Sequence, residues 1–198
     1  VLSPRFTLYH DYSLQVMDVL RRESALVQPM SIDEAYVDLT PVADSMAEAE
    51  GLAHRMQGRI RVDLGLPASV GLAPNKLVAK VACETGKPQG FVVVRMGEEP
   101  GFLAPLPVKA LPGIGPRSEQ RLLASGFGTL GQLAEASMES VMAALGPWGA
   151  VLQRRARGED FSPVSTDRET KSISAEETFA QDLTDEGALR DEVTRLAG

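Results

Sequence analysis

A short acidic stretch separates two apolar segments early in the chain and decides how the fold is interpreted: Ser31-Ile32-Asp33-Glu34-Ala35-Tyr36-Val37-Asp38. Pro29 and the polar residues after it predict a hairpin turn, and the segment that follows predicts a strand. Neighbouring strand residues point to opposite faces, so the carboxylates of Asp33 and Glu34 reach one site only at a strand end or a turn. Such a pair suits Mg²⁺, which prefers oxygen ligands; a solvated turn is the alternative interpretation.

The segments on either side of this turn predict an α+β fold. Apolar residues recur every three or four positions in three of them, which indicates helices, whereas the shorter apolar runs indicate extended chain. The expected elements are, in chain order, a helix over 9–23, extended chain over 26–39, a helix over 44–64, a strand over 68–73, a helix over 74–86 and a strand over 91–94. This order predicts a partial sheet with helices on one face.

The second half of the chain differs in character from the first. Glycine and proline between 97 and 107 indicate a linker, and residues 109–158 predict short helices that begin and end at glycine, proline, serine or threonine. We expect this region to be a small all-α domain whose core contains Trp148. A polar linker is expected over 159–171, and a new structural unit is expected to begin after it.

Two lysines lie on one face of the helix predicted over 74–86. Lys76 and Lys80 are four residues apart, close to the helix N-terminus, and so share a helical face. The free backbone amides and the dipole at a helix N-terminus attract anions, so these lysines predict a phosphate-binding site. A solvated helix face without a ligand is the alternative interpretation.

A second candidate phosphate site is the glycine-containing stretch Leu111-Pro112-Gly113-Ile114-Gly115. Two glycines around one apolar residue form a tight connection whose backbone amides can point outward, and a helix begins directly after it. Such a site contacts phosphate rather than base edges and is therefore independent of nucleotide sequence. A plain helix–helix turn is the alternative. Further along, Arg154, Arg155 and Arg157 either suit the C-terminus of a helix or contact DNA.

The composition limits the classes of protein that fit. The chain has 198 residues, of which 43% are hydrophobic and 24% charged, as in soluble globular proteins rather than disordered ones. It contains no apolar run of about 18 residues and no signal peptide, so neither a membrane span nor secretion is expected. Cys83 is the only cysteine, which excludes a disulfide framework and a multi-cysteine metal site and favours the reducing cytoplasm.

The net charge of −7, taken over the whole chain, argues against binding to nucleic acid. The charge is unevenly distributed, however. Residues 71–95, which include both lysines of the predicted helix, carry four basic groups and one acidic group. Residues 172–198 carry two basic and seven acidic groups. The basic centre of the chain therefore keeps a phosphate-binding function open.

In this order, the motifs resemble those of the Y-family DNA polymerases, the translesion enzymes, and among them the bacterial DNA polymerase IV type. The resemblance covers nearly the whole chain. The residues that carry it are Ser31 to Tyr36, Gly71 to Lys76 with Ala79-Lys80, Lys87 to Gly90, Leu111 to Gly115 and Lys171 to Ser174.

The resemblance implies an α+β palm followed by a small all-α helix–hairpin–helix thumb. It places the partial palm catalytic domain at 1–96, the thumb at 97–161, a tether at 162–171 and the start of a little finger domain at 172–198. The hairpin of the thumb is the part that is implied to hold the DNA backbone, and it contains Gly113, Ile114 and Gly115.

The resemblance also implies an activity, namely template-directed transfer of nucleotides from dNTPs to a primer 3′-hydroxyl by a two-metal mechanism with Mg²⁺. Asp33 and Glu34 are the implied catalytic metal ligands, and Lys80 matches the family's contact to the triphosphate of the incoming nucleotide, with Lys76 beside it. The expected partners are primer-template DNA and dNTP, with a sliding clamp as a further candidate. We expect a cytoplasmic monomer without a membrane partner.

The sequence departs from the family pattern at both ends. Family members begin with a palm strand that carries another metal-binding Asp, followed by a fingers domain, and neither is present here; most of the little finger is missing too. We therefore expect an internal fragment that does not polymerise by itself. Two alternatives stay open: a non-catalytic homologue that acts as an accessory DNA-binding protein in DNA repair, and a helix–hairpin–helix module fused to an α+β interaction domain.

Overall fold

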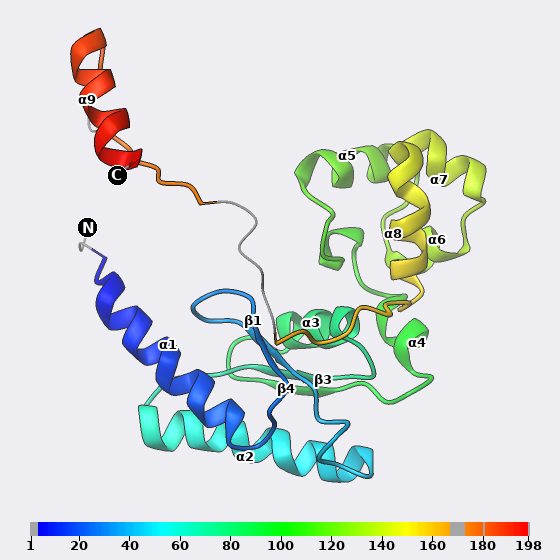
Figure 1. Ribbon diagram of the computed structural model, residues 1–198. Helices are drawn as coiled ribbons and strands as arrows, with labels where there is room; N and C mark the ends of the chain where they lie inside the picture. The colour runs from blue at the N-terminus through cyan, green and yellow to red at the C-terminus, as the bar shows by residue number, and fades with distance from the viewer. Residues whose placement is uncertain (1–3, 167–172, 180, 198) are drawn as a thin grey trace. The chain divides into compact units, whose positions relative to one another are not determined.

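The computed structural model describes residues 4–166, 173–179 and 181–197, and the chain divides into two compact units, Val1–Thr166 and Asp167–Gly198 (Figure 1). The first unit combines short strands with helices. In the second unit, the described residues include the helix α9 (Glu186–Ala197).

The first part of Val1–Thr166 alternates helices and short strands as the sequence predicts, which confirms the α+β class. The two strand pairs are separate: β1 pairs with β2 antiparallel, with Gln28 opposite Tyr36, and β3 pairs with β4 parallel, with Gly71 opposite Val92. The elements are α1 (Phe6–Arg21), β1 (Val27–Pro29), β2 (Ala35–Val37), α2 (Met46–Leu64), β3 (Val70–Leu72), α3 (Lys76–Thr85) and β4 (Phe91–Val93).

Helices cover both faces of the β3–β4 pair, and the prediction of helices on one face was wrong. Val70 and Phe91 pack with the apolar residues of α2, whereas Val92 packs with those of α3. Figure 1 shows α3 on one side of these strands and α2 on the other. The physical reason is that successive strand residues alternate between faces, and here both faces are apolar, so that each needs a covering helix.

The contact between β3 and α3 is very close. A Cβ atom on Gly71 would lie 2.0 Å from the carbonyl oxygen of Ala79 and 2.5 Å from the amide nitrogen of Cys83, so a side chain at position 71 would force the two elements apart. Cys83 Sγ adds a hydrogen bond to the carbonyl oxygen of Ser69 at 3.3 Å. The position of α3, and of the lysines on it, is therefore fixed relative to the strands.

The elements after β4 are helical, and buried leucines form much of their core. The sequence predicts helices over 109–158, but the prediction of a linker between 97 and 107 was wrong, because residues 99–103 form a helix whose Leu103 is fully buried. The elements are α4 (Glu99–Leu103), the 3₁₀ turn η1 (Val108–Ala110), α5 (Pro116–Ala124), α6 (Leu130–Glu135), α7 (Met138–Leu145), the 3₁₀ turn η2 (Gly146–Trp148) and α8 (Gly149–Ala156). Leu122 and Leu152 are fully buried in a core that continues onto Leu77 of α3. Trp148 is 52% exposed, so the prediction that it anchors this core was wrong.

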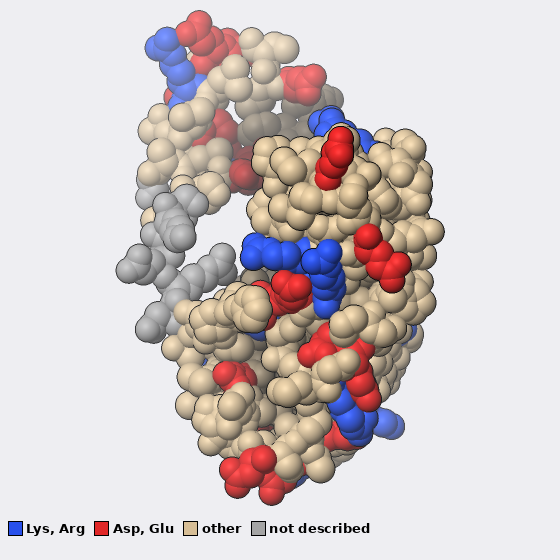
Figure 2. Space-filling model, turned by 90° about the vertical axis from the view of Figure 1, so that its right-hand side faces the viewer, with Lys and Arg blue, Asp and Glu red and all other residues tan. Residues whose placement is uncertain are grey.

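Charged side chains of both signs are interspersed on the face of the molecule in Figure 2, and this face presents no continuous basic area. Within the described ranges, no helix combines the length and the apolar character that a membrane crossing requires. Because basic and acidic side chains are interspersed on this face, affinity for a polyanion would have to come from local contacts rather than from a broad electrostatic field there.

Candidate active site

Residues 30–34, which we call the acidic turn, join β1 to β2, and hydrogen bonds of the backbone close this turn. The amide of Met30 donates to the carbonyl oxygen of Glu34 at 2.8 Å, and the amide of Ser31 donates to the same oxygen at 3.3 Å. Ser31 Oγ donates to Asp33 Oδ1 at 2.5 Å. Asp33 is exposed and Glu34 is half-buried. Adjacent carboxylates thus lie at a turn, the location that the sequence predicts for them.

Helix α3 places the ammonium of Lys80 against this turn. Lys80 Nζ donates to Glu34 Oε1 at 2.5 Å and to Glu84 Oε1 at 2.8 Å, and the Lys80 side chain is 25% exposed. Partial burial by itself lowers the pKa of Lys80, but the hydrogen bonds to the two carboxylates outweigh it and hold the pKa above its usual value. Lys80 is therefore a fixed cation between the acidic turn and the last turn of α3.

Glu84 extends this contact into a chain of alternating charges. Its Oε1 also accepts a hydrogen bond from Lys87 Nζ at 2.8 Å. The hydrogen bonds from Lys80 and Lys87 lower the pKa of the Glu84 carboxyl, so it is held ionised. The prediction from sequence assigned no role to Glu84, although its position four residues after Lys80 is the signal that could have drawn attention to it.

Lys76 lies on the same helix face but has other partners. Its Nζ donates to Gln28 Oε1 at 3.1 Å and to the carbonyl oxygen of Pro163 at 2.7 Å. It also lies 5.5 Å from the centroid of the Tyr36 ring, within the range of a cation–π contact. The two lysines are thus not equivalent: Lys80 contacts the acidic turn, whereas Lys76 joins β1 and β2 to the segment after α8.

The N-terminus of α3 is capped by the protein itself. Asn75 Oδ1 accepts a hydrogen bond from the amide of Val78 at 2.9 Å, and Asn75 Nδ2 donates to the carbonyl oxygen of Gly158 at 2.8 Å. The amide of Leu77 donates to Asp160 Oδ2 at 3.2 Å. Part of the amide set that the sequence offered to a phosphate is therefore engaged by the cap and by a carboxylate 83 residues away, which leaves the lysine side chains as the remaining anion ligands.

Asp33 and Glu34 have the chemistry of a Mg²⁺ site that shares its metal with a substrate. They offer carboxylate oxygens on a partly exposed turn, and Mg²⁺ is usually held by one or two carboxylates together with substrate phosphates. Among the residues that the structure describes, no three His, Cys, Asp or Glu side chains gather closely enough to hold a metal ion. The pair therefore fits a metal that arrives with a phosphate ligand better than it fits a permanent structural metal.

The glycine-containing stretch forms the loop between η1 and α5. Gly113 has a φ of +100°, a conformation that favours glycine, and Gly115 directly precedes Pro116, the first residue of α5. Ile114 is 8% exposed and belongs to the core, whereas the two glycines are exposed. One apolar side chain thus anchors the loop while its backbone faces solvent, which is the geometry that a backbone phosphate contact needs.

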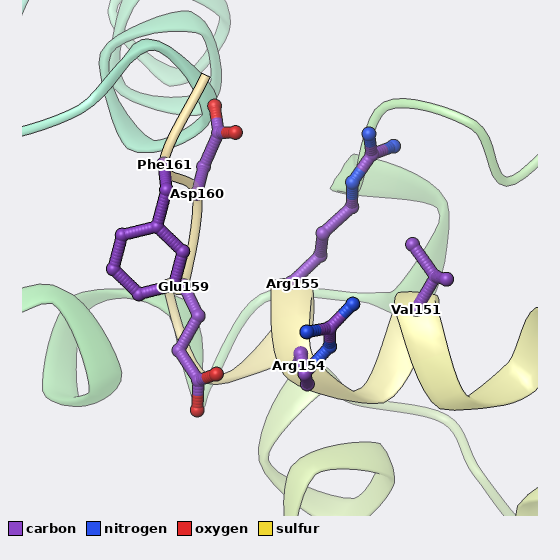
Figure 3. Close-up of a pocket in the computed structure, with 6 residues that line it drawn as sticks. All are labelled: Val151, Arg154, Arg155, Glu159, Asp160 and Phe161. Atoms are coloured by element: carbon purple, nitrogen blue, oxygen red, sulfur yellow. The ribbon is translucent and has the colours of Figure 1, made fainter. Parts of the chain in front are cut away.

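Arg155 of α8 lies beside this loop. Its Nη1 is 3.6 Å from the position that a Cβ on Gly113 would occupy, and its guanidinium carbon lies 5.8 Å from the ring centroid of Trp148. Arg154 and Arg155 line a pocket of about 150 Å³, together with Glu159. The Arg155 side chain points away from the Glu159 carboxylate (Figure 3). Within the described residues Arg155 forms no ion pair. The exposed Trp148 ring therefore supports a cation next to the loop.

The chain is similar to known proteins over most of its length. Residues 1–84 match the model of the impB/mucB/samB family. The chain is 40% identical over 196 residues to the DNA polymerase IV of Xanthomonas axonopodis pv. citri, which covers 99% of this chain and 54% of that protein. Residues 1–84 therefore carry an impB/mucB/samB domain. It is also 43% identical over 199 residues to the DNA polymerase IV of Streptomyces coelicolor, with 99% of this chain and 42% of that protein covered.

Solved Y-family structures share the fold. The crystal structure of DinB from Sulfolobus solfataricus superimposes with a TM-score of 0.76 at 28% identity, over 82% of this chain and 48% of that one. A ternary complex of Dbh gives a TM-score of 0.75, over 82% of this chain and 49% of that one. The chain therefore spans about half the length of the Y-family proteins that it matches.

Proposed function

We propose that this chain is part of a translesion DNA polymerase that transfers nucleotides from dNTPs to a primer 3′-hydroxyl. The observation that carries the proposal is the 2.5 Å hydrogen bond from Lys80 Nζ to Glu34 Oε1, across 46 positions of sequence. It joins the candidate triphosphate ligand to a candidate metal ligand. The impB/mucB/samB domain and the identity of 40–43% to proteins named DNA polymerase IV support the proposal.

In this proposal the residues of the chain bind and orient the reactants. Asp33 and Glu34 would hold Mg²⁺, and the expected pair of ions would, when bound, compensate the negative charge that develops during phosphoryl transfer. Lys80 donates to the triphosphate while the primer hydroxyl oxygen attacks the α-phosphorus and pyrophosphate leaves. The close contact at Gly71 keeps α3 in place during this step, and positioning of this kind is a large part of phosphoryl-transfer catalysis.

The ion pair between Lys80 and Glu34 prepares the site for a substrate that carries both signs of charge. Without a substrate, each group compensates the other at 2.5 Å. A metal-bound nucleotide brings a cation for Glu34 and phosphate oxygens for Lys80, so that each group exchanges one partner for another of the same sign. Neither charge is left uncompensated, which avoids the cost of a desolvated single charge.

Lys76 is proposed as a second contact to the triphosphate, on weaker support than Lys80. To reach a phosphate, its ammonium would exchange the oxygens of Gln28 and Pro163 for phosphate oxygens. The shared helix face and the basic character of residues 71–95 support the assignment.

The helical part of the chain is proposed to be a helix–hairpin–helix thumb that holds the DNA backbone. The exposed backbone of Gly113 and Gly115, the buried Ile114 between them and the guanidinium of Arg155 support this assignment. In the same proposal, residues 1–96 are the partial palm, 97–161 the thumb, 162–171 the tether and 172–198 the start of the little finger. Half of the tether, residues 167–171, falls outside the described residues.

Primer-template DNA and dNTP are the proposed partners, with a sliding clamp as a further candidate, and we propose a cytoplasmic monomer. The ternary complex and the insertion ternary complex of Dbh support the first two partners, because this chain shares the fold of Dbh over most of its length. Mg²⁺ is the proposed cofactor because the proposed activity requires a divalent metal, and the relatives named DNA polymerase IV support that activity.

The decisive experiment replaces the acidic pair in the whole protein and measures single-nucleotide insertion on a primer-template with Mg²⁺. Asp33→Ala and Glu34→Ala should each abolish insertion, because each removes an oxygen ligand of the metal, and should leave DNA binding in place. Asp63→Ala is the matched control, since Asp63 is an exposed carboxylate near the end of α2. Near wild-type insertion by either acidic-turn variant would overturn the assignment.

The same measurements separate the alternative functions. A protein that binds DNA and dNTP but inserts no nucleotide would be the non-catalytic homologue that acts as an accessory DNA-binding protein. A protein whose DNA binding is independent of Mg²⁺ and which has no affinity for dNTP would be an interaction module. The intact carboxylate pair at the turn favours the polymerase over both, because DNA binding alone has no use for an acidic turn.

A further inference from the structure

Glu84 is a charged residue that the proposed reaction does not use. Its side chain is 43% exposed and lies in the last turn of α3, and one of its carboxylate oxygens accepts hydrogen bonds from both Lys80 and Lys87 at 2.8 Å. At this exposure solvent could satisfy the carboxylate without either lysine. Burial of the Glu84 carboxylate therefore does not explain why it accepts hydrogen bonds from two lysines.

Helix stability gives a poor account of Glu84. The C-terminal end of a helix carries a partial negative charge, which disfavours an acidic side chain in the last turn, and α3 has no basic residue there to offset it. The order of the pair is also the weaker one, because Glu is better placed four residues before Lys than four residues after it. This placement costs helix stability, so we look for its role in what it does to Lys80.

We propose that Glu84 is a positioning residue that keeps the Lys80 ammonium beside the nucleotide when a metal engages Glu34. This inference rests on the proposed function. Glu34 is the other anchor of Lys80. If Glu34 held a metal, its oxygen would be engaged by the metal and would no longer anchor the ammonium. Lys80 has three N–H donors, so it can keep the hydrogen bond to Glu84 and give the others to phosphate oxygens.

The reason that Lys80 needs such an anchor is its flexibility. A lysine side chain has a flexible four-carbon stem and loses substantial conformational entropy when its ammonium is held in one place. With Glu84 present, the Lys80 side chain is already ordered before the nucleotide binds, so binding does not include this loss of entropy. With neither carboxylate in contact, the ammonium would turn toward solvent, and each nucleotide would have to order it again.

The charge of Glu84 predicts the opposite effect on binding, which makes the inference testable. A carboxylate close to a triphosphate repels it, so its removal should tighten nucleotide binding if electrostatic repulsion were its whole effect. Lys87 reduces this repulsion, because its ammonium shares the same carboxylate oxygen. Positioning and repulsion therefore change the kinetics of a Glu84 variant in opposite directions.

The experiment is a double-mutant cycle on single-nucleotide insertion by the whole protein, with kcat and KM for dNTP measured for wild type, Glu84→Ala, Lys80→Ala and the double variant. We expect Glu84→Ala to lower kcat/KM by about fivefold, mainly through KM. In the Lys80→Ala background the same change should have no further effect, because Glu84 acts through Lys80. A tighter dNTP KM for Glu84→Ala, or an equal loss in both backgrounds, would overturn the inference.

Two further variants separate positioning from folding and charge. Glu84→Gln keeps an oxygen that accepts from Lys80, so it should recover most of the kcat/KM that Glu84→Ala loses; a Gln variant as impaired as the Ala variant would count against positioning. Lys87→Ala removes the other partner of Glu84 and should stay within about twofold of wild type. If wild type itself inserts no nucleotide, the proposed function has failed, whereas insertion by wild type with a silent Glu84→Ala refutes the positioning role alone.

Discussion

At the scale of single residues, two lysines on one helix face have different surroundings and should have different kinetic roles. Lys80 contacts Glu34 of the acidic turn, whereas Lys76 contacts Gln28 and Pro163. Lys80→Ala should raise KM for dNTP by about tenfold, because it removes a charge-assisted hydrogen bond to the triphosphate. DNA affinity, measured by fluorescence anisotropy with a labelled primer-template, should stay within about twofold.

Lys76→Ala is the control for this prediction, because it removes the same charge from the same helix face four residues away. We expect a smaller rise in KM than for Lys80→Ala, since Lys80 contacts Glu34 of the acidic turn, whereas Lys76 contacts Gln28 and Pro163 instead. If Lys80→Ala weakened DNA binding more than nucleotide use, its assignment to the triphosphate would be wrong.

At the scale of elements, the N-terminus of α3 is held by residues from the other end of the first unit. Asn75 caps the helix through the amide of Val78 and also donates to the carbonyl oxygen of Gly158. Asn75→Ala should therefore lower the free energy of unfolding by about 2 kcal/mol, because it removes a cap and a second hydrogen bond. Urea denaturation of the 198-residue chain, followed by circular dichroism, measures this loss.

Ser45→Ala provides the matched comparison, since Ser45 caps α2 by accepting a hydrogen bond from the amide of Glu48 at 3.2 Å. Its loss should be about 1 kcal/mol, the ordinary value of an N-cap. Equal losses for the two variants would show that the bond from Asn75 to Gly158 contributes nothing to stability.

The elements were predictable where the signal is local, and the site was predictable only in part. The caps at Ser45 and Asn75 and the apolar stripe of α2 involve residues only a few positions apart, and α2 and α3 lie close to the helices predicted over 44–64 and 74–86. The placement of Asp160 on the N-terminus of α3 joins residues 83 positions apart, and no local pattern contains it. The exposure of Trp148 was missed for a different reason: a large aromatic residue was assigned to the core, whereas its ring contacts the nearby Arg155 on the surface.

At the scale of the whole molecule, the net charge of −7 says little about binding to DNA, because its effect is screened. At physiological ionic strength the Debye length is about 8 Å, so the acidic residues on a distant surface contribute little at a phosphate contact. What matters is the set of cations within that distance of the backbone. Arg155, supported by the Trp148 ring and next to Gly113, is such a cation.

The salt dependence of DNA binding tests this local view. Each phosphate contact releases condensed counterions and adds about 0.9 to the slope of log K against log salt concentration for duplex DNA. Arg155→Ala should therefore reduce the slope by about 1 and weaken binding equally for all DNA sequences, since the contact is to the backbone. Arg154→Ala removes the same charge from the neighbouring position of α8, away from Gly113, and should leave the slope nearly unchanged. Equal changes for the two arginines would mean that overall charge, rather than the loop contact, governs affinity, and the thumb assignment would lose its main electrostatic support.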